Sequence, residues 1–220
     1  MLLTIPLWKK VSLKESGEEV QIKVLSIREL ALIPGVKTMW LLFVITCAIE
    51  YTAGVWGSTY LVEAKGLSVD HAAEVVLFYY IGMTVGRLLS SVMATKLTCW
   101  KIIRISLAVL GVAVIMLLLP LPTLIIIAMF MIGLGNGPMF PNFTYLAPAN
   151  FGEDISQSVI STQMAASSIG ILIVPALCGL LGQTFGMNIF PIYLTLLVSI
   201  MVLGVGSIQK TMKMAGKDVC

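Results

Sequence analysis

TMWLLFVITCAIEYTAGVWGSTYLV, residues Thr38–Val62, is an apolar run in which Glu50 is the only charged residue. A helix that crosses a bilayer needs about 20 mostly apolar residues, so this run predicts a membrane-spanning helix. Five more apolar runs follow, at Ala73–Thr95, Ile102–Leu119, Thr123–Ala149, Gln157–Gln183 and Met187–Ile208. They contain glycine and proline and do not alternate apolar with polar residues, which favours helices over barrel strands. We therefore predict an all-α membrane protein with six transmembrane helices.

The composition of the whole chain excludes several classes of protein. Of its 220 residues, 58% are hydrophobic and 11% are charged, and the mean hydropathy is +0.99. A soluble domain would carry about 25% charged residues. The net charge of +3 is too small to indicate a nucleic-acid partner. The four cysteines form no C-x-x-C pair and the chain has one histidine, His71, so we expect no metal site, no disulfide framework and no cofactor. No nucleophile-and-base motif indicates an enzyme.

The charged residues divide the chain into an amino-terminal segment at 1–37, which is a polar loop from Lys9 onward, a membrane bundle at 38–208 and a tail at 209–220. Within the loop, Ser26 and Glu29 fit a capping box, which predicts a short interfacial helix that ends at Pro34-Gly35. Of the fourteen Lys and Arg residues, twelve fall in the loop, the connection between the second and third helices, and the tail. Only Lys65 falls on the opposite side. The positive-inside rule therefore places both termini in the cytoplasm and the bundle in the cell membrane.

Two ionisable side chains lie inside the predicted helices, where each costs a few kcal/mol unless it has a partner or a water-filled cavity. Glu50 is in the middle of the first helix, and Arg87 is in the second helix, past its midpoint on the cytoplasmic side. Antiparallel packing would bring them together. They form either a charged element of a polar pathway or a structural ion pair. Thr46, Glu50, Gly54 and Gly57 repeat at helical spacing, which predicts a polar stripe beside a cavity.

Several neutral polar or aromatic side chains are further candidates for contacts with a polar solute. On the fifth helix, Gln163 and Ser167 share one face. The other candidates are Asn136, Asn142, Tyr79 and Trp56. Packing offers an alternative for each, because polar groups also join membrane helices, at about 0.6 kcal/mol each, and aromatic residues also gather at the membrane interface.

The fourth predicted helix contains GLGNGPMFPN at Gly133–Asn142. A dinucleotide-binding G-x-G-x-x-G loop would need glycine at Phe140 and a preceding strand, so we exclude that function. Glycine and proline inside a membrane helix instead indicate close packing or a bend beside a cavity. The segment is therefore a candidate hinge for a moving helix, formed by Gly133, Gly135, Gly137, Pro138 and Pro141.

Four stretches resemble helices of major facilitator superfamily transporters, and they are most similar to the branch of fucose-permease-like sugar:proton symporters. The resemblance is to the seventh, eighth, tenth and eleventh helices of that fold. The stretches are EYTAGVW at Glu50–Trp56, GMTVGRLLS at Gly82–Ser90, GLGNGPMFP at Gly133–Pro141, and QMA at Gln163–Ala165 with Gly170 and Pro175 after it. The loop motif of the superfamily, G-x-x-x-D-R-x-G-x-x-[KR], aligns with residues 91–101, where only its basic positions, Lys96 and Lys101, are kept.

The resemblance implies a fold in which two six-helix halves, each a 3+3 inverted repeat, enclose a solute site at the midplane. By that resemblance, MLLTIPLWKK is the end of a sixth helix, residues up to Lys37 form the central loop, and the chain is the carboxyl-terminal half. The expected function is proton-coupled transport of a sugar or similar solute by alternating access, together with an amino-terminal half. The alternative is a truncated membrane protein that does not transport, such as a scaffold, a solute sensor or an inactive remnant.

Overall fold

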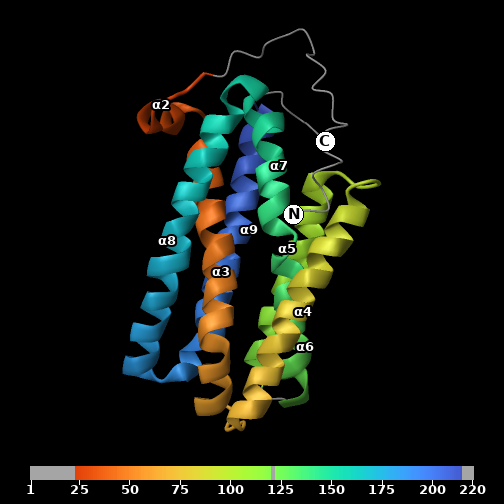
Figure 1. Ribbon diagram of the computed structural model, residues 1–220, viewed down its shortest axis with the longest axis vertical. Coiled ribbons are helices and arrows are strands. Elements are labelled where there is room, and N and C mark those ends of the chain that lie inside the picture. Colours follow the sequence, from red (N-terminus) through yellow and green to blue (C-terminus); the bar gives the residue numbers. More distant parts are fainter. Residues whose placement is uncertain (1–22, 120–121, 215–220) are drawn as a thin grey trace, which may run out of the picture.

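The computed structural model describes residues 23–119 and 122–214, which form a bundle of long helices (Figure 1). The elements in chain order are α2 (Ile27–Leu32), α3 (Val36–Glu63), α4 (Val69–Met93), α5 (Cys99–Leu118), α6 (Pro122–Asn136), α7 (Met139–Phe151), α8 (Glu153–Phe185), the 3-10 helix η2 (Met187–Ile189) and α9 (Phe190–Met214). Six spans are long and apolar enough to cross a membrane, with α6 and α7 sharing one of them. The predicted all-α architecture with six transmembrane helices is confirmed. The predicted sixth-helix-like segment and the end of the tail lie outside the described residues.

The fourth predicted helix, Thr123–Ala149, corresponds to one membrane span that is interrupted within its length. The structure divides it into α6, which ends at Asn136, and α7, which begins at Met139. Proline has no N–H and disrupts the preceding helical turn, so Pro138 cannot donate a hydrogen bond to the carbonyl of Leu134. The interruption therefore falls at Gly137-Pro138, inside the segment that the sequence identified as a candidate hinge.

The short helix α2 begins with the capping box that the sequence predicted. The Ser26 hydroxyl accepts a hydrogen bond from the Glu29 backbone N–H, and the Glu29 carboxylate accepts one from the Ser26 backbone N–H at 2.7 Å. This backbone hydrogen bond and one from the Ser26 hydroxyl lower the pKa of Glu29. Gly35 then adopts a φ of +92°, a conformation that favours glycine, and α3 begins at the next residue.

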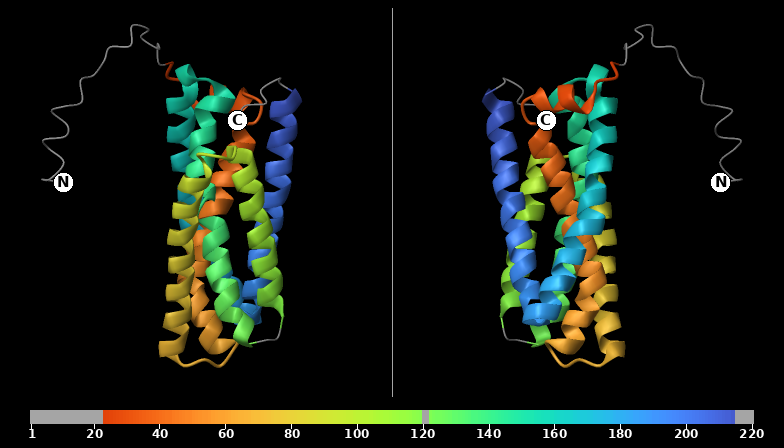
Figure 2. Two further views of the ribbon diagram at one scale, coloured as in Figure 1. Left: turned by 90° about the vertical axis from the view of Figure 1, so that its right-hand side faces the viewer. Right: turned by 90° about the vertical axis from the view of Figure 1, so that its left-hand side faces the viewer.

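Two helix pairs make the most extensive contacts in the bundle, α3 with α8 and α4 with α6. The first three spans, α3, α4 and α5, form one unit, and the last three, α6 with α7, α8 and α9, form the other. In each pair the first helix of one unit packs against the middle helix of the other, as expected for an inverted 3+3 repeat. The third helices are also related by this symmetry, because each packs on the first helix of the other unit: α9 on α3, and α5 on α6. In the side views of Figure 2, α9 lies at the edge opposite α4, and α8 crosses the bundle between them.

Glycines let the paired helices approach at backbone distance. A Cβ atom added at Gly82 or Gly86 of α4 would collide with the carbonyl oxygens of Phe130 or Leu134 on α6. A Cβ at Gly133 of α6, or at Gly137 directly after that helix, would collide with carbonyl oxygens of α4. Each side of this contact thus carries a G-x-x-x-G pair, which is the arrangement that small residues allow between membrane helices.

The basic residues of the described chain gather toward one end of the bundle. That end holds the start of α3, the connection from α4 to α5, the connection from α7 to α8, and the end of α9 (Figure 1). Its basic residues are Lys23, Arg28, Lys37, Lys96, Lys101, Arg104, Lys210 and Lys213. Among the described residues, Lys65 is the only basic residue at the opposite end. We refer to the end where these eight basic residues gather as the basic end.

Candidate functional site

The two charged side chains inside the membrane helices meet. Glu50 on α3 and Arg87 on α4 form an ion pair in which the guanidinium Nη2 lies 3.4 Å from the carboxylate Oε1. The side chains are partly exposed, Glu50 to 24% and Arg87 to 51%. Because α3 and α4 run antiparallel from adjacent ends, they bring these distant positions to the same depth, as the sequence predicted. A pair that is exposed in this way can exchange partners with a solute, whereas a sealed ion pair cannot.

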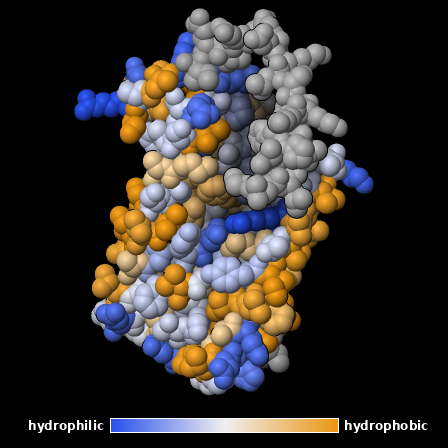
Figure 3. Space-filling model, viewed as in Figure 1, coloured by the Kyte–Doolittle hydropathy of each residue, from blue (hydrophilic) through white to orange (hydrophobic). Residues whose placement is uncertain are grey.

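The ion pair lies in a cavity of about 450 Å³, which we call the central cavity. Four helices line it, with three residues from α3, one from α4, and two each from α7 and α8. These residues are Cys47, Glu50, Tyr51, Arg87, Phe140, Pro141, Ser167 and Ile171. The space-filling view shows hydrophilic and neutral residues along the middle of this face and hydrophobic residues along its sides (Figure 3). The central cavity therefore has a mixed polar and apolar wall, which is typical of a small-molecule site.

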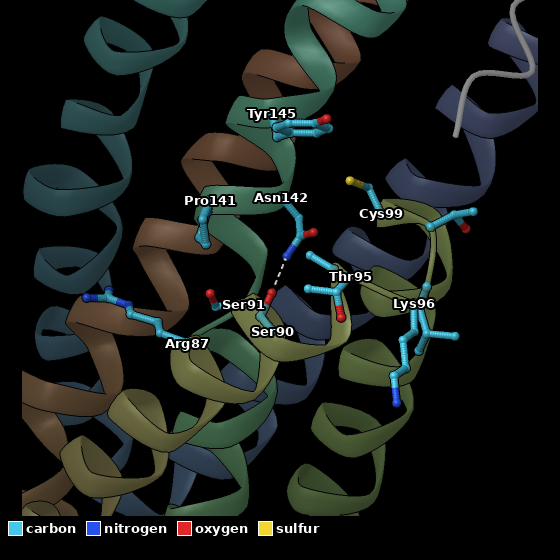
Figure 4. Close-up of a pocket in the computed structure, with 12 residues that line it drawn as sticks. Arg87, Ser90, Ser91, Thr95, Lys96, Cys99, Pro141, Asn142 and Tyr145 are labelled. Carbon is cyan, nitrogen blue, oxygen red and sulfur yellow. Dashed lines mark hydrogen bonds between the residues drawn. The ribbon is translucent and has the colours of Figure 1, made fainter. Parts of the chain in front are cut away.

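A second hollow of about 610 Å³, which we call the terminal groove, extends from the central cavity toward the basic end (Figure 4). It lies between the end of α4, the start of α5 and α7. Its lining is rich in hydroxyl and amide groups and consists of Arg87, Ser90, Ser91, Ala94, Thr95, Lys96, Leu97, Thr98, Cys99, Pro141, Asn142 and Tyr145. Arg87 and Pro141 line both spaces, so the terminal groove and the central cavity meet at these two residues.

Asn142 is the predicted solute contact that lines the terminal groove. Its side-chain amide donates hydrogen bonds to the Ser90 hydroxyl at 2.8 Å and to the Pro138 carbonyl at 2.7 Å (Figure 4). The first bond joins α7 to α4, and the second lies beside the interruption between α6 and α7. Asn142 thus connects the wall of the groove to the candidate hinge.

Two other predicted contacts are occupied in helix packing. Tyr79 is fully buried, and its hydroxyl donates a hydrogen bond to the Glu50 backbone carbonyl at 3.1 Å. The buried Asn136 donates from its side-chain amide to the Thr46 carbonyl at 3.2 Å, which joins α6 to α3. Both residues lie outside the linings of the central cavity and the terminal groove. They hold the helices around the site, including the backbone that carries Glu50.

Trp56 and Gln163 also lie outside these linings. The Trp56 indole donates a hydrogen bond to the Pro175 carbonyl at 2.7 Å and covers Gly179, so this ring joins α3 to α8. Gln163 is fully buried, and neither polar atom of its amide has a hydrogen-bond partner within the described part of the chain. It lies one helical turn from Ser167, which does line the central cavity.

The stripe predicted on the first helix is a packing surface rather than a cavity wall. The Thr46 hydroxyl bonds to the Leu42 carbonyl within α3. A Cβ at Gly54 would meet the Tyr80 hydroxyl of α4, and one at Gly57 would meet Met129 of α6. Only Glu50 of this stripe reaches the cavity. The helix is apolar nearly all round, so the sequence pattern did not distinguish the side that faces α4 and α6 from the side that faces the cavity.

The glycines of the candidate hinge have packing roles in this structure. Gly133 and Gly137 face α4, and a Cβ at Gly135 would lie 2.9 Å from the Ser106 carbonyl oxygen of α5. Hinge motion at Gly137-Pro138 stays a prediction, since the structure shows one conformation of the interruption.

The sequence reasoning missed four residues of the central cavity as site candidates: Cys47, Tyr51, Phe140 and Ile171. It assigned Cys47 to packing, and for Ser167 it left open whether the hydroxyl contacts a solute or joins helices. Cys47 and Tyr51 are four residues apart on the helix that carries Glu50, and Ser167 and Ile171 are also four apart, so each pair shares a helix face. This spacing was the signal available in the sequence. Within residues 23–119 and 122–214, no three His, Cys, Asp or Glu side chains gather as metal ligands would.

Comparisons with known proteins agree with this architecture. The sequence profile of the Major Facilitator Superfamily matches residues 5–175. A search of curated protein sequences found no significant match. The fold is similar to that in the "In meso crystal structure of the POT family transporter PepTSo", with a TM-score of 0.66 and 15% sequence identity over 80% of this chain. This chain spans only 37% of that one. Because the profile covers more than half of the sequence, the chain belongs to the Major Facilitator Superfamily of membrane transporters and is not an enzyme.

Proposed function

We propose that the chain is the carboxyl-terminal half of a proton-coupled secondary transporter that moves a small polar solute by alternating access. The observation that carries this proposal is the Glu50–Arg87 pair in a cavity at the middle of the membrane spans. Ionisable residues at this depth are costly and mark solute or proton pathways when they face a cavity. The cavity volume of about 450 Å³ lies within the usual range for small-molecule sites.

The assignment to one half of a transporter is supported by the polar face in Figure 3 and by the partial match to a transporter of similar fold. The chain corresponds to 37% of the transporter with the similar fold. Its cavity is walled by α3, α4, α7 and α8. An amino-terminal six-helix half would supply the opposite wall. The resemblance to fucose-permease-like transporters supports the carboxyl-terminal assignment and suggests a sugar-like solute.

The proposed orientation places the basic end in the cytoplasm, because basic connections are retained on that side of a membrane. The terminal groove then leads from the cytoplasm to the central cavity. Arg87 and Pro141 lie where the two spaces meet, next to the interruption at Gly137-Pro138. Movement of α7 relative to α6 at this interruption would widen or close the passage, which is one of the changes that alternating access requires.

In the proposed coupling, Glu50 carries the proton. While Glu50 is charged it pairs with Arg87, and the pair holds α3 and α4 together beside the cavity. Protonation of Glu50 ends the ion pair and frees the guanidinium to contact the solute. The backbone of Glu50 is held independently by the Tyr79 hydroxyl, so the carboxyl group can change partner without moving the helix.

Uptake in membrane vesicles tests the proposed function. The vesicles come from cells that make this chain together with a matching amino-terminal half, and an imposed proton gradient drives uptake of labelled sugars and sugar acids. Glu50→Gln and Arg87→Ala should each reduce uptake at least about tenfold, as expected for loss of a charged group at a solute site. Glu74→Gln and Arg104→Ala change the same residue types outside both spaces and should leave uptake unchanged.

Uptake that survives the combined Glu50→Gln and Arg87→Ala substitutions would show that the pair is structural. Absence of proton-driven uptake for every solute tested, with both halves present in the membrane, would favour the non-transporting alternative. The chain without a partner half should not transport, because it supplies one wall of the pathway. Robust uptake by the purified 220-residue chain would contradict the assignment to one half.

A further inference from the structure

Most N–H donors of the Arg87 guanidinium form no hydrogen bond with the described residues. An arginine side chain carries five N–H donors in a planar fork that binds a carboxylate through two parallel hydrogen bonds. In this structure Arg87 makes one contact with Glu50, at 3.4 Å, which is longer than the 2.7–2.9 Å typical of a charge-assisted hydrogen bond. No other hydrogen bond or ion pair of Arg87 is formed within residues 23–119 and 122–214. The fork is therefore only partly used by the protein.

The charges along the two spaces favour an anion. The described residues that line the terminal groove include two cations, Lys96 and Arg87, and no carboxylate. In the central cavity Arg87 and Glu50 are the two oppositely charged side chains of the lining. The route from the basic end to the cavity thus has an excess of positive charge between apolar helices, an arrangement that concentrates anions by focusing the electric field.

From these two observations, and on the basis of the proposed function, we infer that the solute carries one carboxylate, which binds the Arg87 guanidinium in exchange for Glu50. One cation in the central cavity matches one negative charge. A dianionic phosphate ester would leave a charge uncompensated, because Lys96 lies in the terminal groove and not in the cavity lining. The hydroxyl groups of Ser167 and Tyr51 line the same cavity and suit a hydroxylated carbon chain, as in a sugar acid.

The exchange conserves charge. Glu50 starts as a carboxylate paired with Arg87 and ends as a protonated carboxyl group, while the solute carboxylate replaces it on the guanidinium. One proton enters with one anion, so the net charge of the site does not change. The other ionisable groups near Glu50 are Cys47 and Tyr51 on α3 and Tyr79 on α4, and the lining residues from α7 and α8 are uncharged: Phe140, Pro141, Ser167 and Ile171. Proton uptake is thus assigned to Glu50.

The test is a binding measurement on the full 220-residue chain in lipid nanodiscs, with sodium gluconate, glucose and glucose 6-phosphate as probes at equal ionic strength. Gluconate and glucose share a hydroxylated carbon chain, and gluconate adds the carboxylate. At pH 6 and about tenfold excess over its Kd, gluconate should raise the Tm by about 3 °C, since a ligand stabilises the state that binds it. Glucose and glucose 6-phosphate should shift the Tm by less than about 1 °C.

Variants identify the group that binds the carboxylate. Arg87→Gln should weaken gluconate binding about 30-fold or more through loss of the charged partner, whereas Arg104→Gln, on α5 outside both spaces, should not change it. In the unmodified chain, gluconate should bind more weakly at pH 8 than at pH 6, because charged Glu50 competes for Arg87. Glu50→Gln removes this competitor and should make binding equal at the two pH values.

Tighter binding of glucose or glucose 6-phosphate than of gluconate, or binding of none of the three, would overturn the inference. So would gluconate binding that Arg87→Gln leaves intact in a folded protein, as judged by an unchanged elution volume. The uptake experiment separates this failure from that of the proposed function. Proton-driven uptake of a neutral sugar that depends on Glu50 and Arg87 would keep the proposed function and exclude the carboxylate.

Discussion

Two neighbouring residues of α4 belong to regions that are built in opposite ways. Gly86 lies in the contact between α4 and α6, and Arg87 lines the central cavity. At Gly86 the backbone of α4 touches the carbonyl of Leu134, with no room for a side chain. At Arg87 the helix presents a long charged side chain to open space. A rigid glycine contact thus fixes the position from which the guanidinium extends. The comparison teaches that the partly exposed charged side chain of the site extends from a closely packed helix pair.

Gly82→Ala should produce the largest effect, because the added methyl group collides with the Phe130 carbonyl. Overpacking of this kind costs about 3 kcal/mol, which we expect as a large loss of Tm and of monodisperse protein in detergent. The matched control is Gly111→Ala on α5, where a Cβ meets nothing within 4 Å. That change should stabilise the helix slightly, by about 0.5 kcal/mol. Equal effects at the two glycines would show that close packing of α4 against α6 does not exclude a side chain at Gly82.

The Glu50–Arg87 pair should contribute less to stability than the glycine contact. Both side chains are partly exposed, so we expect a coupling energy of about 1 kcal/mol rather than the larger values of sealed pairs. A double-mutant cycle with Glu50→Gln and Arg87→Gln, measured by thermal unfolding at pH 7, gives this coupling. A coupling energy above about 3 kcal/mol would show that the pair is mainly a structural lock.

Asn142→Ala should destabilise the chain by about 1 kcal/mol, because it removes the hydrogen bonds to Ser90 and to the Pro138 carbonyl. Ser90→Ala should cost less, since the Asn142 amide keeps its bond to Pro138. Ser91→Ala, an exposed change on the same groove, is the control and should stay within about 0.5 kcal/mol of the unmodified chain. The measurement is again Tm, and a larger effect of Ser90→Ala than of Asn142→Ala would contradict this account.

The smallest effect should come from the pH dependence of the α2 cap. The pKa of Glu29 is lowered from 4.5 in the folded chain, so its contribution is complete above that value and is lost as the pH falls through the lower, folded pKa. Hydrogen exchange of the α2 amides, corrected for the intrinsic pH dependence of exchange, should show weaker protection at pH 3 than at pH 7. Glu29→Gln retains a capping group without the charge and should remove this difference. A difference that persists in the variant would assign it to another group.

The sequence predicted the six spans, the capping box of Ser26 and Glu29, and the meeting of Glu50 with Arg87. Each of these depends on local hydropathy, on spacing within one turn, or on the cost of an isolated charge in a membrane. It left open whether Tyr79, Asn136 and Trp56 contact a solute or pack between helices, and it did not identify Cys47 and Tyr51 as residues of the cavity. A polar group joins two helices or faces a cavity according to what lies opposite it.

The sequence by itself determined the class of the protein, the number of its spans and the end at which its basic residues gather, because burial of an apolar helix in lipid requires no knowledge of its neighbours. Only the tertiary structure decided which side of each helix faces protein, cavity or lipid. Lipid and the protein interior are equally apolar, so hydropathy does not distinguish them. For α4, the glycine contacts with α6 determine which side faces the protein. They fix the rotation of α4 about its axis and thereby direct Arg87 into the central cavity.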